Sequence, residues 1–250
     1  MAAITPLLTG GGIDLRRPGR PRHSGRAVSG GGSAREEILD RAARFFTTKG
    51  YAATSTRDIA EACGIRQASL YYYFAGKHEV LADLLGMTVR PSSEKIEEIE
   101  RELLPESLEA ALYLLALVDT FTLAQAPHNV AILGRLPDVI SAGDGEVYAE
   151  FQADRHQLIE AYTNLGHRLA QRNGTAATPA GLGAMLIDLV EGVIQARADG
   201  GLIDSERAHE IASGCLRLCG CDQTQIDTAR TRAEQLRAEL WRESLVETPR

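Results

Sequence analysis

The stretch that decides the fold runs from Thr54 to Lys77 and reads TSTRDIAEACGIRQASLYYYFAGK. Ser55 is followed three residues later by Asp58, a spacing typical of the capping box that begins a helix. Gly64 predicts where this helix ends, because glycine readily adopts the left-handed conformation that closes many helices. A second short helix is expected from Gln67 to Phe74. Two short helices joined by a three-residue turn are the pattern of a helix-turn-helix.

The second of these helices is expected to have two different sides. Leu70 and Phe74 fall on one side, where they would pack on Ile59 and Phe45. The opposite side is small, polar and aromatic and consists of Gln67, Ala68, Tyr71 and Tyr72. Such a face can enter a major groove, where a glutamine amide pairs with adenine, an alanine methyl contacts thymine and a tyrosine hydroxyl reaches phosphate. The alternative for the tyrosines is a place in the core.

Basic and polar side chains around this face are further candidates for DNA contacts. Arg66 precedes the second helix and is the best candidate for guanine, with a purely solvent-exposed role as the alternative. Thr56 and Arg57 open the first helix, where phosphate contacts are expected; a cap and a solvated side chain are the alternative. Lys77 opens the next helix, so its ammonium and the free backbone N–H groups can hold another phosphate.

The first 32 residues are rich in Gly, Pro and Arg and are predicted to form a disordered arm. Within it, Arg16–Arg22 has a Gly-Arg-Pro core with basic flanks, similar to an AT-hook. Extended Gly-Arg-Pro keeps the backbone narrow, so Arg20 and Arg22 can lie in an A·T-rich minor groove. The alternative is a solvated tail. The residues predicted to contact DNA are Arg20, Arg22, Thr56, Arg57, Arg66, Gln67, Ala68, Tyr71, Tyr72 and Lys77.

The charge distribution favours contact with a polyanion at one end of the chain. The formal net charge is -7, but residues 1–90 contain 13 Lys and Arg against 8 Asp and Glu, whereas residues 91–250 contain 14 against 26. A basic N-terminal third on an acidic remainder suggests that one end meets nucleic acid and the other does not.

The amino-acid composition indicates the cellular compartment in which the protein is expected. Apolar residues make up 44% of the chain and charged residues 24%, as in a soluble globular protein. Four cysteines are too few for a disulfide scaffold, and no apolar run approaches the roughly 18 residues that a membrane span needs. No secretory signal is recognised at the N-terminus, so we expect a cytoplasmic protein without a membrane partner.

Helical periodicity also covers the rest of the sequence, and the alternation typical of strands is absent. Ser33 and Glu36 form another capping-box pattern, which begins a helix that Gly50 ends. Later helices are expected near residues 77–90, 108–118, 148–169, 179–199, 205–218 and 223–245. We therefore expect an all-α fold. A three-helix DNA-binding domain is predicted over residues 33–78, followed by a helical regulatory and dimerisation domain over residues 79–250. Helices within 107–173 would transmit an effector signal, and those within 179–220 would hold the dimer.

The stretch from Ser33 to Leu85 closely resembles the N-terminal domain of TetR-family transcriptional repressors. The resemblance is carried by Ile38-Leu39-Asp40, Phe45-Phe46, Gly50-Tyr51, Thr54-Ser55-Thr56, Asp58-Ile59-Ala60, Gly64-Ile65, Leu70-Tyr71-Tyr72-Tyr73-Phe74 and Lys77. Arg66 departs from the pattern, since many members carry a capping serine there. The resemblance implies a homodimeric repressor that binds double-stranded DNA at a palindromic operator and is associated with the nucleoid.

A narrower resemblance is to AmtR-type nitrogen-control repressors within this family. It is carried by Gly19–Arg22, Arg35–Asp40, Gly64–Tyr72, Val89–Ser92 and Gly134–Leu136. It implies control of genes for ammonium, urea or other nitrogen sources. It also implies release from DNA by an adenylylated PII-type signal protein rather than by a small ligand.

Two other functions stay open at this point. A repressor induced by a small molecule would need a sizeable cavity with convergent polar groups in the second domain. An enzyme that happens to carry a helix-turn-helix would need clustered titratable groups. The sequence shows no such cluster, no nucleophile motif and no nucleotide-binding loop, so we expect neither catalysis nor a cofactor.

Arg155 and three cysteines near the C-terminus have no assigned role. Arg155 interrupts an apolar repeat, and it either pairs with a buried carboxylate or faces an anionic effector. Cys215, Cys219 and Cys221 could be metal ligands. However, the first two lie four residues apart on one helix and no histidine follows at zinc-finger spacing, so packing is favoured.

Overall fold

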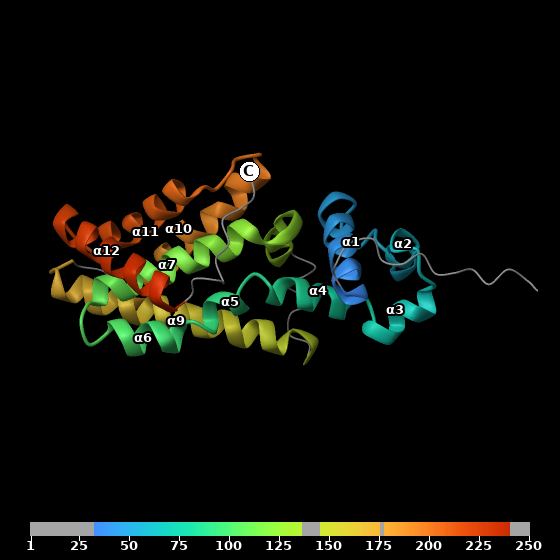
Figure 1. Cartoon of the computed structure of the whole chain (residues 1–250), viewed down its shortest axis with the longest axis horizontal. Helices are drawn as coiled ribbons and strands as arrows, with labels where there is room; N and C mark the ends of the chain where they lie inside the picture. Colours follow the sequence, from blue (N-terminus) through green and yellow to red (C-terminus); the bar gives the residue numbers. More distant parts are fainter. Residues whose placement is uncertain (1–32, 137–145, 176–177, 241–250) are drawn as a thin grey trace, which may run out of the picture. The chain divides into compact units, whose positions relative to one another are not determined.

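The computed structural model of the chain describes residues 33–136, 146–175 and 178–240. Every regular element in these ranges is a helix, so the expected all-α fold is confirmed (Figure 1). The α-helices are α1 (Ala34–Thr48), α2 (Thr56–Ala62), α3 (Gln67–Tyr73), α4 (Lys77–Gly86), α5 (Arg90–Ser93), α6 (Ile96–Leu103), α7 (Leu108–Gln125), α9 (Ala149–Arg172), α10 (Pro179–Ala198), α11 (Ser205–Leu218) and α12 (Gln223–Leu240). Two 3₁₀ segments are η1 (Pro127–Arg135) and η2 (Glu146–Tyr148). The arm over residues 1–32 lies outside the described residues.

Both predicted capping boxes are formed. Ser33 Oγ accepts from the backbone N–H of Glu36, and Glu36 Oε2 accepts from the backbone N–H of Ser33 at 2.7 Å. At the start of α2, Ser55 and Asp58 make the same reciprocal pair. Each box satisfies two backbone donors that a helix start otherwise leaves free, so local sequence alone fixes where α1 and α2 begin.

The turn between α2 and α3 depends on Gly64. Its φ is +66°, in the left-handed region that favours glycine. The Ile65 N–H bonds back to the Ala60 carbonyl at 3.0 Å, and the Gly64 N–H bonds to that of Glu61 at 3.1 Å. These two bonds form a Schellman motif, which ends α2 and directs the chain into α3.

The first four helices share one apolar core. Buried side chains on α1, α2 and α3 include Phe46, Ile59 and Leu70, and they pack in the same cluster as Leu81 of α4. The cluster continues into η1 through Val130. Helix α4 therefore packs along its length with the helix-turn-helix. The limits of 33–78 and 79–250 for two domains remain a prediction.

The helix expected up to Pro91 is divided in two. α4 ends at Gly86, and Pro91 lies in the first turn of α5. Proline has no N–H to donate, so it fits a first turn, where that hydrogen would be unpaired, better than a helix interior.

The C-terminal helices surround α7. Helices α6, α9, α10, α11 and α12 all contact it (Figure 1). Its side chains are buried on nearly all sides. By length and composition, α7 and α10 are both apolar enough to cross a membrane. The apolar stretch of α7 lies in the protein interior, since 72% of it is buried. The buried share of the stretch in α10 is 33%.

Helices α9 and α10 pack closely together. A Cβ placed on Gly183 of α10 would lie 3.1 Å from the Cα of Thr163 on α9, so this crossing requires a residue without a side chain. The opposite side of α10 stays open, and Met185 on it is 51% exposed. The predicted wide apolar face of this helix is therefore only partly covered within one chain.

Candidate nucleic-acid interface

Helix α3 has the two sides that its sequence predicts. Leu70 and Phe74 are buried, whereas Gln67 and Ala68 are exposed. Tyr71 is 49% exposed and Tyr72 is 85% exposed. The expectation that both tyrosines face outward rather than into the core is confirmed. Because the inner side anchors the helix, the outer side can be presented to a partner without loss of packing.

One hydroxyl joins α2 to this outer side. Thr56, the first residue of α2, accepts a hydrogen bond from Gln67 Nε2 at 2.9 Å. Its Oγ1 also lies 3.2 Å from the Tyr71 hydroxyl, where either oxygen can be the donor. The sequence gives no indication of this contact. From its position at the start of α2, Thr56 is predicted to contact phosphate instead.

The two arginines of the motif differ in what they contact. Arg66 is the N-cap residue of α3 but makes no side-chain cap. Its exposed guanidinium has no hydrogen-bond or ion-pair partner within the described ranges. Arg57 Nε donates to Glu61 Oε1 at 2.7 Å, one turn along α2. Both side chains of that pair are exposed, so Arg57 can leave Glu61 for a phosphate at little cost.

Lys77 is more occupied than its sequence position suggests. Its Nζ donates to the carbonyls of Tyr51 at 2.9 Å, Thr54 at 3.1 Å and Ala52 at 3.3 Å. It also lies 4.5 Å from the centre of the Tyr51 ring. The ammonium therefore holds the loop before α2 onto the start of α4. A phosphate contact from Lys77 remains a prediction, and it would require the exchange of one of these bonds.

The start of α2 is fixed electrostatically as well. Hydrogen bonds from the backbone and side chain of Ser55, and one from Lys49, lower the pKa of Asp58 to about 2. The carboxylate is therefore ionised at neutral pH and completes the cap. Arg20 and Arg22, the predicted minor-groove residues, lie outside the described residues, and their contacts remain predictions.

Comparison with known proteins agrees with this geometry. Residues 38–84 match the family model described as bacterial regulatory proteins, tetR family. The crystal structure of AmtR from Mycobacterium smegmatis is 36% identical to this chain, covers 82% of it and 95% of its own chain, and superimposes with a TM-score of 0.71. The chain belongs to the TetR family.

Other TetR-family proteins match a smaller part of this chain or match it at lower identity. The transcriptional repressor KstR2 from Rhodococcus jostii is 34% identical over 107 residues, which are 42% of this chain and 50% of that protein. The chain thus spans about half the length of this curated relative. PfmR from Thermus thermophilus is 23% identical, covers 72% of this chain and 97% of its own, and has a TM-score of 0.60, which shows the shared fold. These relatives are TetR-family regulators rather than enzymes, in agreement with the expectation of no catalysis.

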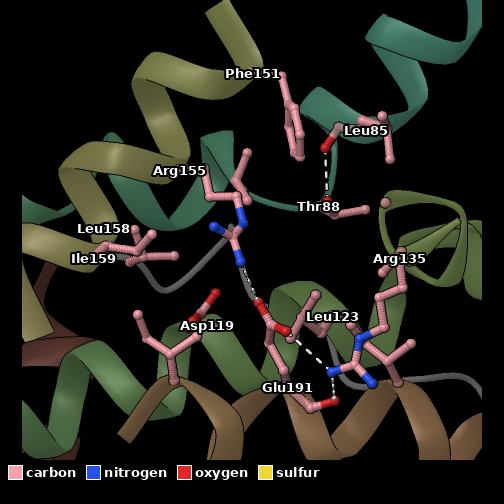
Figure 2. Close-up of a pocket in the computed structure, with 15 residues that line it drawn as sticks. Leu85, Thr88, Asp119, Leu123, Arg135, Phe151, Arg155, Leu158, Ile159 and Glu191 are labelled. Atoms are coloured by element: carbon pink, nitrogen blue, oxygen red, sulfur yellow. Dashed lines mark hydrogen bonds and ion pairs between the residues drawn. The ribbon is translucent and has the colours of Figure 1, made fainter. Parts of the chain in front are cut away.

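A small cavity lies between the end of α4, η1, α7, α9 and α10. Its volume is about 70 Å³. Arg155 Nη2 donates across it to Glu191 Oε1 at 3.4 Å, and Arg135 Nη2 donates to Glu191 Oε2 at 3.0 Å (Figure 2). Of the two interpretations of Arg155, the ion pair with a carboxylate is therefore found, although that carboxylate is only partly buried.

Asp119 is a cavity residue that sequence reasoning missed. It is buried, and its carboxylate accepts from Ser92 Oγ at 3.0 Å and from the Tyr162 hydroxyl at 3.2 Å. Burial raises its pKa to about 7 despite these two donors. A signal was present, since Asp119 is the single charged residue between positions 110 and 125.

The cysteines of α11 and the turn after it are packing residues. Cys215, Cys219 and Cys221 are all buried. Burial raises the pKa of the Cys219 thiol to about 12 and that of Cys221 to about 11, so neither is a thiolate at neutral pH. No group of three or more metal-ligating side chains occurs in the described part of the chain.

Proposed function

We propose that this chain is a dimeric repressor that reads a palindromic operator with the outer side of α3. The observation that carries the proposal is that the inner side of α3 is anchored by Leu70, while Gln67 and Arg66 are exposed beside it. These two side chains supply the donors and acceptors that base edges in a major groove require. The repressor KstR2 and AmtR among its relatives support the same interpretation.

In this proposal residues 33–78 bind DNA and residues 79–250 regulate and dimerise. Thr56 and Arg57 at the start of α2, together with the backbone N–H groups that open α4, contact phosphates. Arg20 and Arg22 of the arm extend the contact into the adjacent minor groove. The protein acts in the cytoplasm, at the nucleoid.

Two copies of the chain would pair through the open side of α9 and α10. A surface groove of about 300 Å³ lies between these helices, lined by Ile159 and Thr163 of α9 and by Ala184 and Ile187 of α10. Met185 adds exposed apolar surface on the same helix α10. Pairing of such a face would hold two α3 helices at the spacing of successive major grooves, which a palindromic site requires.

Substitution at α3 tests base reading. Gln67→Ala or Arg66→Ala should weaken binding to the selected operator by roughly 1–3 kcal/mol and relax base preference at one position in each half-site. The measurement is fluorescence anisotropy with the operator and with each single-base variant. An equal loss on operator and random DNA would contradict base reading by that residue.

The pathway follows from the resemblance to AmtR-type repressors. The similarity to the Mycobacterium smegmatis protein extends over most of both chains, and not only over the helix-turn-helix. We propose that the target genes serve the uptake and use of ammonium, urea or other nitrogen sources. An adenylylated PII-type signal protein would release the repressor from DNA.

Genomic fragments bound by the protein test the pathway. Their neighbouring genes should encode nitrogen-source transport and metabolism, and a set without such genes would contradict the assignment. For the partner, the adenylylated signal protein should dissociate the purified operator complex while the unmodified form should not. Equal behaviour of the two forms would exclude release by adenylylation.

A repressor induced by a small molecule is the second candidate, and the cavity beside Asp119 favours it. The cavity has convergent polar groups, but its volume of about 70 Å³ is far below the roughly 300–1,000 Å³ of sites for drug-sized ligands. A solute of a few non-hydrogen atoms could enter without rearrangement. Loss of operator binding on addition of such a solute, abolished by Glu191→Gln, would favour this candidate.

A further inference from the structure

We propose that Thr56 is a positioning residue that sets which groups of the Gln67 amide face the DNA base. The inference rests on the proposed function, since it concerns how the outer side of α3 reads a groove. It assigns the Thr56 hydroxyl to base selection and leaves the phosphate contact expected at the start of α2 to the Thr56 backbone N–H.

Three side chains from two helices meet at one oxygen. Gln67 opens α3, and Tyr71 lies one turn later on the same side of that helix. Thr56 Oγ1 is 2.9 Å from Gln67 Nε2 and 3.2 Å from the Tyr71 hydroxyl. The Gln67 amide and the Tyr71 hydroxyl are thus held together before any DNA arrives.

The contact with Thr56 leaves a defined pattern on the Gln67 amide. An amide nitrogen has two hydrogens, and one of them is donated to Thr56. The other hydrogen and the carbonyl oxygen remain free, so the amide offers one donor and one acceptor to a base. Adenine is the base that presents the complementary pair in the major groove, at N7 and N6.

Rotation of the amide by half a turn would change this pattern. The oxygen would then face Thr56, and two N–H donors would face the groove, which matches the two acceptors O6 and N7 of guanine. Thr56 can accommodate that state only if its own hydrogen points at the amide oxygen. Whether this hydrogen is free therefore decides between the two bases.

In the complex with DNA, the Tyr71 oxygen accepts the hydroxyl hydrogen of Thr56. When the Tyr71 O–H donates to a phosphate oxygen, its own oxygen can accept from Thr56. Thr56 then has no hydrogen left for the amide oxygen, and only a lone pair faces Gln67. The order of donation runs from Gln67 to Thr56, from Thr56 to Tyr71 and from Tyr71 to phosphate, and it keeps the amide in its adenine-reading orientation.

The network is separate from the features that hold the fold. The start of α2 is capped by Ser55 and Asp58, and α3 is anchored through Leu70. Thr56→Val keeps the shape of the side chain and removes only the hydroxyl. This variant therefore separates base selection from folding.

The experiment uses the full-length chain. An operator is first selected from a random DNA library with the unmodified protein, and Gln67→Ala identifies the base pair that Gln67 reads. Affinities for that operator and its three base substitutions are then measured at one salt concentration. Thr56→Val, Thr56→Ser and Tyr71→Phe are compared. Thr48→Val is the matched control, since Thr48 is an exposed threonine at the end of α1 whose hydroxyl donates to the Arg44 carbonyl of its own helix.

We expect the unmodified protein to prefer adenine over guanine at that position by roughly 10-fold or more. Thr56→Val and Tyr71→Phe should each bring the ratio to within about threefold of one. Thr56→Ser should restore the preference, and Thr48→Val should leave it unchanged. Adding Gln67→Ala to Thr56→Val should give the same base preference as Gln67→Ala alone.

Two results would overturn the inference. One is a Thr56→Val protein whose affinity falls equally for all four bases, which would limit Thr56 to phosphate. The other is an adenine-to-guanine ratio that Thr56→Val leaves intact. Failure of the unmodified protein to select any sequence would instead contradict the proposed function itself.

Discussion

Asp119 illustrates at the scale of one residue how surroundings change the chemistry of a side chain. It lies on α7 with its carboxylate facing Ser92 of α5 and Tyr162 of α9. Both partners are neutral donors, and the cation of Arg155 is engaged with Glu191. Desolvation therefore outweighs the hydrogen bonds and raises the Asp119 pKa to about 7.

The raised pKa predicts how stability depends on pH. The folded state keeps the Asp119 proton at pH values where the unfolded chain has lost it. The stabilising contribution is therefore complete below about pH 4, falls as pH rises toward 7, and is lost above it. The loss is at most about 4 kcal/mol. Asp119→Asn should flatten this dependence between pH 4 and 7 in urea unfolding.

An exposed carboxylate gives the control for this measurement. Glu97 on α6 is exposed, so Glu97→Gln should leave the slope of stability against pH as it is in the unmodified protein. A slope that Asp119→Asn does not change would show that Asp119 does not carry the buried proton.

At the scale of elements, η1 connects helices from both halves of the chain. His128 Nε2 lies 2.8 Å from Asp40 Oδ1 on α1. Asn129 Nδ2 donates to the Ile194 carbonyl of α10 at 2.9 Å. Both residues adopt left-handed backbone conformations, with φ of 51° and 53°, which residues other than glycine rarely adopt. The strain persists because contacts on both sides hold the segment.

Replacement of Asn129 should separate strain from hydrogen bonding. Asn129→Ala keeps a Cβ in the left-handed region and loses the bond to Ile194, whereas Asn129→Gly loses the same bond but relieves the strain. We expect the alanine variant to be less stable than the glycine variant by about 1 kcal/mol in urea unfolding. Equal stabilities would mean that the backbone at this position stores no strain.

The sequence could predict the α2–α3 unit but not η1. Capping boxes and the Gly64 turn depend on residues three to five positions apart, so they can be recognised in the chain itself. The conformation of Asn129 depends on the Ile194 carbonyl, 65 residues away in the chain. No local sequence pattern predicts this conformation.

At the scale of the whole molecule, the exposed side of α10 sets the proposed assembly. Met185→Glu should place a charge on the exposed side of α10 in each copy and convert a dimer into a monomer. Sedimentation should show half the mass, circular dichroism should be unchanged, and operator affinity should fall because the two half-sites are no longer bound together. Leu202→Glu is the matched control, since Leu202 is 93% exposed in the link between α10 and α11. A Met185→Glu protein that remains dimeric would place the interface elsewhere.

The arm provides a second prediction at this scale. Deletion of residues 1–26 removes Arg20 and Arg22 and should weaken operator binding and flatten its dependence on salt, because fewer counterions are released. A salt titration of the operator complex measures both effects. Unchanged affinity and slope would remove the predicted role of the arm.

The sequence by itself determined most of the helices, the capped starts of α1 and α2, and which side of α3 faces outward, but not α6, η1 or the division of α4 from α5. These features follow from hydrogen bonds and apolar spacing within one or two helical turns, and such short-range patterns are written directly in the residue order. The partners of individual polar groups were decided only by the tertiary structure. Packing brings the Lys77 ammonium to three loop carbonyls, the Thr56 hydroxyl to Gln67, and Asp119 to two neutral donors away from water. Those partners are set by where whole helices cross, and the crossing depends on the shapes of many side chains at once.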